Sequence, residues 1–294
     1  MAIPKKVRRM VRAVLKQQGI RALVQARVVP RLPTAAQRAL PDYIIIGGQK
    51  CGTTSLDAYL RHHPNVREGL YKEIHFFDLH FDKGLNWYRA HFPTHASMER
   101  AAQLLGSRVV TGESTPSYLF HPLVPQRMHE TIPSVRVIAI LRDPVDRAHS
   151  HWQQIVDWNE EQLSFEEAID AEAERLPQHP ETLTDLRQLD DYLRFSYLAR
   201  GRYAEQLPRW LEAFPREQVL VLSFDDLKAD TSRVCRQVTD FLGLPEFSMD
   251  VFPRTASRPR GRMAPGTRER LREYFRPHNQ RLYELLGRDL GWDT

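Results

Sequence analysis

Short runs of mostly apolar residues recur along this chain, and each is followed by glycine or polar residues and then by a segment with helical spacing. The runs cover residues 43–46, 108–112, 135–141 and 219–222. Apolar runs of this length, rich in Val, Ile and Leu, are typical of parallel strands buried on both faces. Their alternation with helical segments predicts an α/β fold, with a central parallel sheet flanked by helices.

The helices expected between these strands begin near residues 53, 122, 144, 201 and 225, and a last, long helix leads to Trp292. Pro144 suits the first turn of its helix. The strand that begins at residue 108 is expected to end at Gly112, ahead of Glu113 and Ser114. We expect residues 41–294 to form one domain, preceded by a basic N-terminal extension of residues 1–40.

The loop after the first strand has the composition of an anion-binding site. Gly47 and Gly48 end the strand, Lys50 lies at the crest of the loop, and hydroxyl residues typical of helix caps begin the next helix at Thr53. Such a junction points unpaired backbone N–H groups and the positive end of a helix dipole at one place. It predicts a phosphate- or sulfate-binding loop; the alternative is a glycine turn with a solvated lysine.

The order of residues in this loop differs from that of nucleotide-triphosphate loops. In those loops the lysine directly follows the second conserved glycine and precedes a Ser or Thr that binds magnesium. Here Lys50 comes two residues before Gly52, which is followed by Thr53 and Thr54. A magnesium-dependent nucleotide kinase is an alternative that this order disfavours, and an assay with EDTA separates the two.

A second candidate site segment runs from residue 71 to residue 78 and mixes charged, imidazole and aromatic side chains. Glu73 or His75 could serve as the base that removes a proton from a hydroxyl or amine acceptor. In the alternative interpretation, Lys72 and Glu73 form a solvated charge pair and His75 packs in the core.

Polar residues also follow two later strands. Ser114 and Thr115 follow the strand at 108–112, and Arg142 follows the strand at 135–141. The carboxyl ends of parallel strands line the ligand crevice of open α/β sheets, so these residues should face the same place as Lys50. Ser150 lies two helical turns beyond Arg142, and a guanidinium with a hydroxyl suits a terminal phosphate.

An alternative for the segment after residue 141 is a helix pair between Asp143 and Arg147 with a capping role. The last cationic segment contains Arg254, Arg258 and a further run of two arginines around a glycine at residues 260–262. Closely spaced arginines repel one another unless an anion lies among them. We expect a lid over a phosphorylated cofactor rather than a nucleic-acid site, because interleaved aromatics are missing.

Composition limits the function only loosely. The 294 residues are 41% hydrophobic, and 42 Lys and Arg against 37 Asp and Glu give a net charge of +5, which favours anionic ligands without requiring them. Two cysteines, Cys51 and Cys235, are too few for a disulfide framework and suit a reducing compartment. We expect no metal site, no membrane-spanning helix and no secretion signal, and hence a cytoplasmic protein.

Residues 1–40 are dense in Arg and Lys, with apolar residues at helical spacing between them. They could form an amphipathic helix in peripheral contact with the inner membrane surface. We prefer a solvated extension that packs on the domain, because aromatic anchors are missing.

Three of these segments occur in the order found in the family of sulfotransferases that use 3′-phosphoadenosine 5′-phosphosulfate (PAPS) and release 3′,5′-adenosine bisphosphate (PAP). The chain resembles this family over residues 42–292, most of all the branch of heparan sulfate and other carbohydrate sulfotransferases and their bacterial relatives. The matching motifs are the loop at 48–54, the Arg142 to Ser150 spacing, and the run Arg260-Gly261-Arg262.

The resemblance implies roles for individual residues. The 5′-phosphosulfate would be held by Gly48, Gln49, Lys50, Cys51, Gly52, Thr53, Thr54 and Ser55. The 3′-phosphate would be held by Arg142 and Ser150, and the nucleotide would be covered by Tyr203, Arg260, Gly261 and Arg262. Lys50 would also stabilise the leaving phosphate. Glu73 would be the catalytic base, with His75 as the second choice.

The chain departs from the heparan-type pattern at two points. Ser114 stands where that branch commonly has a lysine, which puts a second cation near the sulfuryl group in doubt. No cysteine follows Cys235, although that branch tends to have a disulfide ahead of its last cationic loop. The second departure favours a soluble, bacterial enzyme over one of the Golgi lumen.

The implied reaction is in-line transfer of a sulfuryl group from PAPS to an acceptor hydroxyl, in preference to an amine, without an obligatory metal. The acceptor could be a carbohydrate, a lipid or a natural product, because residues 78–105 and 156–200, which we expect to contact it, contain no readable motif. No nucleic-acid partner is expected, and the oligomeric state is left open. A rival from another class is a non-catalytic anion- or membrane-surface-binding protein that acts through residues 1–40.

Overall fold

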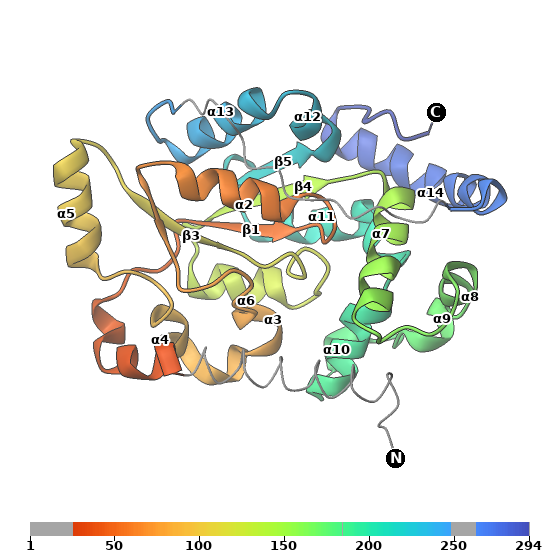
Figure 1. Ribbon diagram of the computed structural model, residues 1–294, viewed down its shortest axis with the longest axis horizontal. Coiled ribbons are helices and arrows are strands. Elements are labelled where there is room, and N and C mark those ends of the chain that lie inside the picture. The colour runs from red at the N-terminus through yellow and green to blue at the C-terminus, as the bar shows by residue number, and fades with distance from the viewer. Residues whose placement is uncertain (1–25, 184, 248–262, 294) are drawn as a thin grey trace, which may run out of the picture.

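Five strands form one parallel sheet at the centre of the computed structural model, which describes residues 26–183, 185–247 and 263–293 (Figure 1). The order across the sheet is β2-β3-β1-β4-β5, and every neighbouring pair is parallel. The sheet and its flanking helices confirm the predicted α/β fold of a single domain. The strands are β1 Tyr43–Gly47, β2 Val66–Glu68, β3 Val110–Ser114, β4 Arg136–Leu141 and β5 Val219–Ser223.

Helices connect the strands and cover the two faces of the sheet. The α-helices are α2 Thr53–His62, α3 Phe76–Leu79, α4 Gly84–Arg89, α5 His95–Leu105, α6 Val124–Thr131, α7 Pro144–Asp157, α8 Phe165–Asp170, α9 Glu172–Arg175, α10 Leu186–Phe195, α11 Tyr203–Ala213, α12 Phe224–Ala229, α13 Thr231–Leu242 and α14 Pro265–Leu286. The 3-10 helices are η1 Val29–Gln37, η2 Phe81–Lys83, η3 Pro180–Thr182, η4 Ala199–Gly201 and η5 Arg216–Gln218.

The central strands are apolar on both faces because each face is covered by helices. Ile44 and Ile46 of β1 belong to a core cluster with side chains from α6 and α11, whereas Tyr43 and Ile45 pack with side chains from α2, α12 and α13. Figure 1 shows these two helical layers on opposite sides of the sheet. Alternation of side chains along a strand therefore explains the unbroken apolar run at residues 43–46.

Several observed elements differ from the predicted ones. β3 continues through Glu113 and Ser114, and the short strand β2 was not predicted because its Val-Arg-Glu sequence has no apolar run. The helix after β5 is divided into α12 and α13 at Asp230, whose side chain caps α13. α14 ends at Leu286, ahead of Trp292, because Gly287 adopts a left-handed conformation with φ +64°.

Part of the expected N-terminal extension packs on the domain. Val28 and Ala35 are buried, and the guanidinium groups of Arg31 and Arg38 both donate to the carbonyl oxygen of Phe92, at 2.6 and 2.9 Å. The rest of the extension, residues 1–25, lies outside the described residues. The membrane-surface alternative for this segment stays a prediction.

The strand order places two loops at the point where the connections diverge. From β1 the chain crosses towards β2, beyond β3, whereas from β4 it continues to β5 on the other side of the sheet. Ligands of open α/β sheets bind outside the carboxyl ends of the strands at such a point. The loops after β1 and β4, which carry Lys50 and Arg142, therefore meet at the expected place for a ligand.

Candidate functional site

The loop after β1 is hydrogen-bonded to the neighbouring strand β4 and leads into the start of α2. The backbone N–H of Gly48 donates to the carbonyl oxygen of Ile140 at 2.7 Å. Gly52 is the residue before α2 and has φ +96°, and no side chain caps this helix. A Cβ at Gly52 would lie 2.7 Å from the Phe224 ring, so both conformation and packing require glycine. The uncapped helix start supplies backbone donors for an anion.

Arg142 lies against this loop. Its Nη1 donates to the carbonyl oxygen of Lys50 at 3.3 Å, and its guanidinium lies over the Phe224 ring at 5.1 Å. The Tyr203 hydroxyl donates to the carbonyl oxygen of Arg142 at 2.9 Å and lies 3.5 Å from the Sγ of Cys51. Burial raises the pKa of the Cys51 thiol, so it is neutral and acts here by packing. Four residues named from the sequence thus lie together.

The buried polar atoms without a hydrogen-bond partner among the residues that the structure describes include Gln49 Oε1, Ser114 Oγ and Ser150 Oγ. Ser150 lies in α7 and is almost fully buried. Buried polar atoms are nearly always satisfied in native proteins, so an orphaned hydroxyl indicates a missing partner. Together with the Arg142 guanidinium and the uncapped start of α2, it fits a phosphorylated nucleotide.

The segment with Glu73 and His75 lies at the same edge of the sheet. The backbone N–H of Glu73 donates to the carbonyl oxygen of Ser114, the last residue of β3, at 3.0 Å. Lys72 Nζ lies 3.2 Å from Thr54 Oγ1 in the first turn of α2 and 2.9 Å from Glu73 Oε1. Lys72 therefore connects this segment to the anion-binding loop, a contact that the sequence did not reveal.

The carboxylate of Glu73 belongs to a charged chain with His75 and Asp78. His75 Nδ1 lies 2.9 Å from the buried Asp78 carboxylate, and its Nε2 lies 3.7 Å from Glu73 Oε2. Burial would lower the pKa of His75, but the two carboxylates raise it to about 10. Burial would raise the pKa of Glu73, but its hydrogen bond to His75 and the charge of Lys72 lower it to about 2. Around neutral pH, His75 is a cation and Glu73 an anion.

The buried carboxyl group of Glu113, which was not identified as important from the sequence, is connected to this segment by hydrogen bonds. Glu113 Oε1 accepts from the Tyr88 hydroxyl at 2.5 Å, and Oε2 accepts from the Thr115 hydroxyl at 2.8 Å. Tyr118, whose hydroxyl lies 3.4 Å from Glu113, accepts from the backbone N–H of Phe76 at 2.8 Å. A single carboxyl group inside an apolar strand is the sequence signal that could have identified it.

Some predictions about the site are not addressed by the described residues. Arg260, Gly261 and Arg262 lie in 248–262, outside the described ranges, so their role as a lid stays a prediction. In the described part of the chain, no group of three or more His, Cys, Asp and Glu side chains could hold a metal ion. The expectation of a metal-free site likewise stays a prediction.

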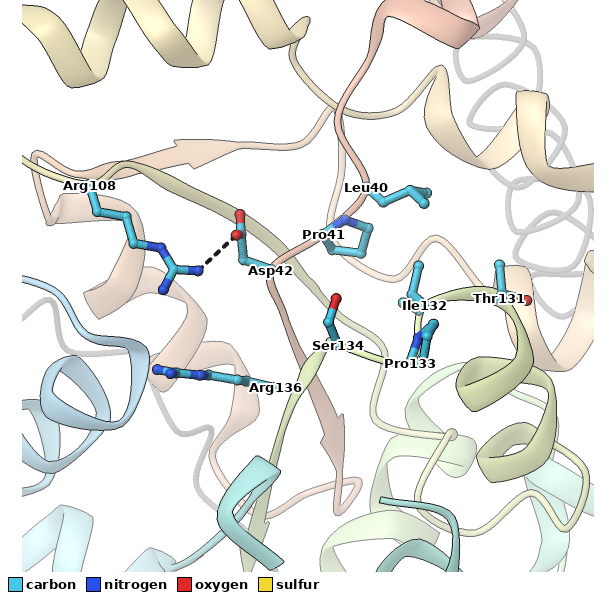
Figure 2. Close-up of a pocket in the computed structure, with 9 residues that line it drawn as sticks. All are labelled: Leu40, Pro41, Asp42, Arg108, Thr131, Ile132, Pro133, Ser134 and Arg136. Atoms are coloured by element: carbon cyan, nitrogen blue, oxygen red, sulfur yellow. Dashed lines mark hydrogen bonds and ion pairs between the residues drawn. The ribbon is translucent and has the colours of Figure 1, made fainter. Parts of the chain in front are cut away.

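A cavity of about 480 Å³ lies at the opposite, amino-terminal edge of the sheet (Figure 2). Arg108 and Arg136 line it beside Leu40, but Arg108 pairs with Asp42 at 3.0 Å and Arg136 donates to the carbonyl oxygen of Phe241. These partners occupy the guanidinium groups. The candidate site remains the carboxyl edge, where unpartnered polar atoms and the loop backbone converge.

Comparison with known proteins identifies the family. The family model described as "Sulfotransferase domain" matches residues 40–256. The chain belongs to the sulfotransferase family. This confirms the resemblance drawn from the motifs and makes the protein a sulfotransferase enzyme.

Several relatives of this sulfotransferase belong to the expected branch. The heparan sulfate glucosamine 3-O-sulfotransferase 6 of Mus musculus is 31% identical to it, over 90% of this chain and 78% of the relative. The membrane-associated sulfotransferase kil1 of Dictyostelium discoideum is 26% identical, over 87% of this chain and 67% of the relative. The crystal structure of a sulfotransferase from Alicyclobacillus acidocaldarius is 36% identical with a TM-score of 0.66, covering 87% of this chain and all of that one.

Sulfotransferases of this family generally use PAPS, which agrees with the phosphorylated nucleotide that the site residues fit. The kinase alternative is not favoured by these comparisons. Among the described helices of the sulfotransferase, none combines the length and the apolar character needed to cross a bilayer.

Proposed function

We propose that this sulfotransferase transfers the sulfuryl group of PAPS to an acceptor hydroxyl and releases PAP. The observation that carries the proposal is the contact of Arg142 with the loop after β1, at 3.3 Å from the Lys50 carbonyl oxygen. The buried Ser150 hydroxyl of α7, which has no partner among the described residues, supports it. An uncapped helix start and a guanidinium suit the two ends of a nucleotide that is phosphorylated at both its 5′ and 3′ positions.

Each part of the site has a task in this mechanism. Bound PAPS supplies the sulfuryl group, which moves in line from its phosphate oxygen to the acceptor oxygen. Lys50 and the first amides of α2 stabilise negative charge on the leaving phosphate. Arg142 and Ser150 hold the 3′-phosphate, and Tyr203 keeps the Arg142 backbone in place through its 2.9 Å hydrogen bond. The remaining loop residues, Gly48 to Ser55, form the cradle around the 5′-phosphosulfate.

Glu73 is the proposed base that takes the proton from the acceptor. Its low pKa keeps it ionised around neutral pH, whereas His75 is protonated there and has no free lone pair for a proton. This supports Glu73 over His75. The cation of His75 instead holds the Glu73 carboxylate in place, and Asp78 stabilises the charge of His75.

The acceptor is proposed to be a carbohydrate, in preference to a lipid or a natural product. The name of the Mus musculus relative assigns to that protein a hydroxyl of heparan sulfate glucosamine, and this supports O-sulfation of a sugar here. Peripheral contact with a membrane through residues 1–40 is a secondary proposal, supported by the membrane-associated relative. A cytoplasmic location, a bacterial source and a domain boundary at residue 40 remain proposals as well.

Calorimetric titration with PAP, and with ATP in parallel, tests the cofactor proposal. The protein should bind PAP in EDTA as tightly as in magnesium, and Arg142→Ala should weaken this binding by at least about tenfold, the loss expected for a charged hydrogen-bonding partner of phosphate. Arg136→Ala is the matched control. Arg136 lies at the other end of β4 and is also placed over a phenylalanine ring, at 5.5 Å.

The control should keep its affinity for PAP, because Arg136 faces the amino-terminal edge of the sheet. Binding of ATP with magnesium in preference to PAP would contradict the proposal and would favour the kinase alternative. Equal losses in the two arginine variants would show that charge alone, not the site, governs binding.

A further inference from the structure

The carboxylate of Asp146 is shared by two arginines from different parts of the fold. Asp146 lies in the first turn of α7, and its Oδ2 is 3.5 Å from Nη2 of Arg142. Its Oδ1 accepts from Nη2 of Arg268, in the first turn of α14, at 2.8 Å. Figure 1 shows α14 beside α7 at the carboxyl edge of the sheet. A residue 126 positions after Arg142 therefore shares a partner with it.

The two contacts with Asp146 are unequal. The bond from Arg268 has the length of a charge-assisted hydrogen bond, whereas the contact with Arg142 is at the limit of one. Burial would raise the pKa of Asp146, but its bond to Arg268 and the charge of Arg142 lower it. The carboxylate is thus ionised and already satisfied by Arg268, and the three side chains together carry one net positive charge.

We propose that Arg268 is a positioning residue of the nucleotide site, which occupies Asp146 and so leaves the Arg142 guanidinium available for the 3′-phosphate. Without Arg268, Asp146 would pair with Arg142 alone and neutralise it. The inference rests on the proposed PAPS-dependent function. No motif in the sequence points to Arg268. It follows the last cationic run and lies in a helix, not in one of the loops that form the site.

The neighbouring Arg270 provides a matched control within the same helix. Its Nη1 pairs with Asp170 at 2.8 Å, the same length as the Arg268 pair, and both side chains of this pair are exposed. Within the described ranges, the Asp170 carboxylate pairs with Arg270 and with no residue of the proposed site. Arg270→Ala therefore removes the same charge and a similar ion pair from α14 without changing the environment of Arg142.

Titration of PAP into the full-length wild type, Arg268→Ala, Arg270→Ala, Asp146→Asn and the double variant Arg268→Ala/Asp146→Asn tests the inference. Arg268→Ala should weaken PAP binding about fivefold, the upper range for a partly exposed ion pair. Arg270→Ala and Asp146→Asn should bind as the wild type does, or more tightly in the case of Asp146→Asn. In the double variant the loss should disappear, because no carboxylate is left to capture Arg142.

Other outcomes overturn the inference. A fivefold loss that persists in the double variant would mean that Arg268 contacts the phosphate directly, and an equal loss in Arg270→Ala would mean a general effect of charge. Unchanged binding in Arg268→Ala, with normal binding by the wild type, would refute this inference alone. A wild type that does not bind PAP would overturn the proposed function and the inference with it. Thermal unfolding of each variant identifies any loss caused by misfolding.

Discussion

Two carboxyl groups at the carboxyl edge of the sheet have pKa values displaced in opposite directions. Glu73 is half-exposed and surrounded by cations, which lower its pKa to about 2, whereas the burial of Glu113 raises its pKa to about 7. The Glu73 carboxylate of the folded protein is therefore an anion around neutral pH. The Glu113 carboxyl group changes its charge within the physiological range. Their different environments agree with different roles, the proposed catalytic base at Glu73 and a structural group at Glu113.

The chemical task of Glu73 leads to a direct test. Glu73→Gln keeps the shape of the side chain but removes the base, so kcat should fall by about 10²- to 10⁴-fold while PAP binding is retained. Glu68→Gln is the control, because Glu68 pairs with Arg61, at 2.8 Å, and not with Lys72 or His75. Sulfation rates are measured with a panel of hydroxyl acceptors. A Glu73→Gln variant with the wild-type rate would rule out Glu73 as the base.

The structural task of Glu113 predicts a pH-dependent stability. The folded state holds the proton more tightly than the unfolded chain, where a glutamate has a pKa of about 4.3. This contribution to stability is therefore complete below about pH 4 and is lost as the pH rises through 7. Its full size is about 4 kcal/mol, from the difference between the two pKa values.

Denaturant unfolding of the wild type and Glu113→Gln between pH 4 and pH 8 measures this contribution. The glutamine is neutral throughout, so the wild type should lose about 3 kcal/mol relative to the variant over this range. Glu99→Gln, on the exposed surface of α5, should stay within about 0.5 kcal/mol of the wild type. A constant difference between the wild type and Glu113→Gln would show that Glu113 ionises normally in the folded state.

At the scale of elements, the segment around η1 packs against the rest of the fold. Val28 and Ala35 of this segment, residues 28–38, are buried, and its Arg31 and Arg38 guanidinium groups donate to the Phe92 carbonyl oxygen. Deletion of residues 1–40 should therefore lower the free energy of unfolding by about 2 kcal/mol or more relative to deletion of residues 1–25, since one buried Val contributes that much. Thermal and denaturant unfolding of the two truncated chains check this; equal stabilities would contradict it.

The lengths of the elements were harder to predict than their presence. The apolar runs at 43–46, 135–141 and 219–222 match β1, β4 and β5 to within one residue at every end. The strand β2 was not predicted, because an edge strand of three residues is defined by its pairing with β3 and not by its composition. The division between α12 and α13 depends on a cap at Asp230 that only the chain geometry reveals.

At the scale of the molecule, the parallel sheet gives its two edges different properties. Its carboxyl edge brings together the loops after β1, β3 and β4, which are up to about a hundred residues apart in sequence. Its amino edge carries the 480 Å³ cavity, where Asp42 and a backbone carbonyl occupy the arginines. The net charge of +5 is compatible with anionic ligands at either edge, so strand polarity, not total charge, selects the site.

The sequence by itself determined the α/β class, the sulfotransferase family and the loop with Lys50, because these depend on local patterns: apolar runs, glycine turns and residue order. Only the tertiary structure decided how distant side chains combine. Three contacts join separate elements of the fold. They are the contact of Lys72 with Thr54, the hydrogen bonds around Glu113, and the pairing of Asp146 with two arginines. The charges and pKa values of these residues depend on burial and on distances of a few ångströms, which the packing of the folded chain sets and no spacing along the sequence encodes.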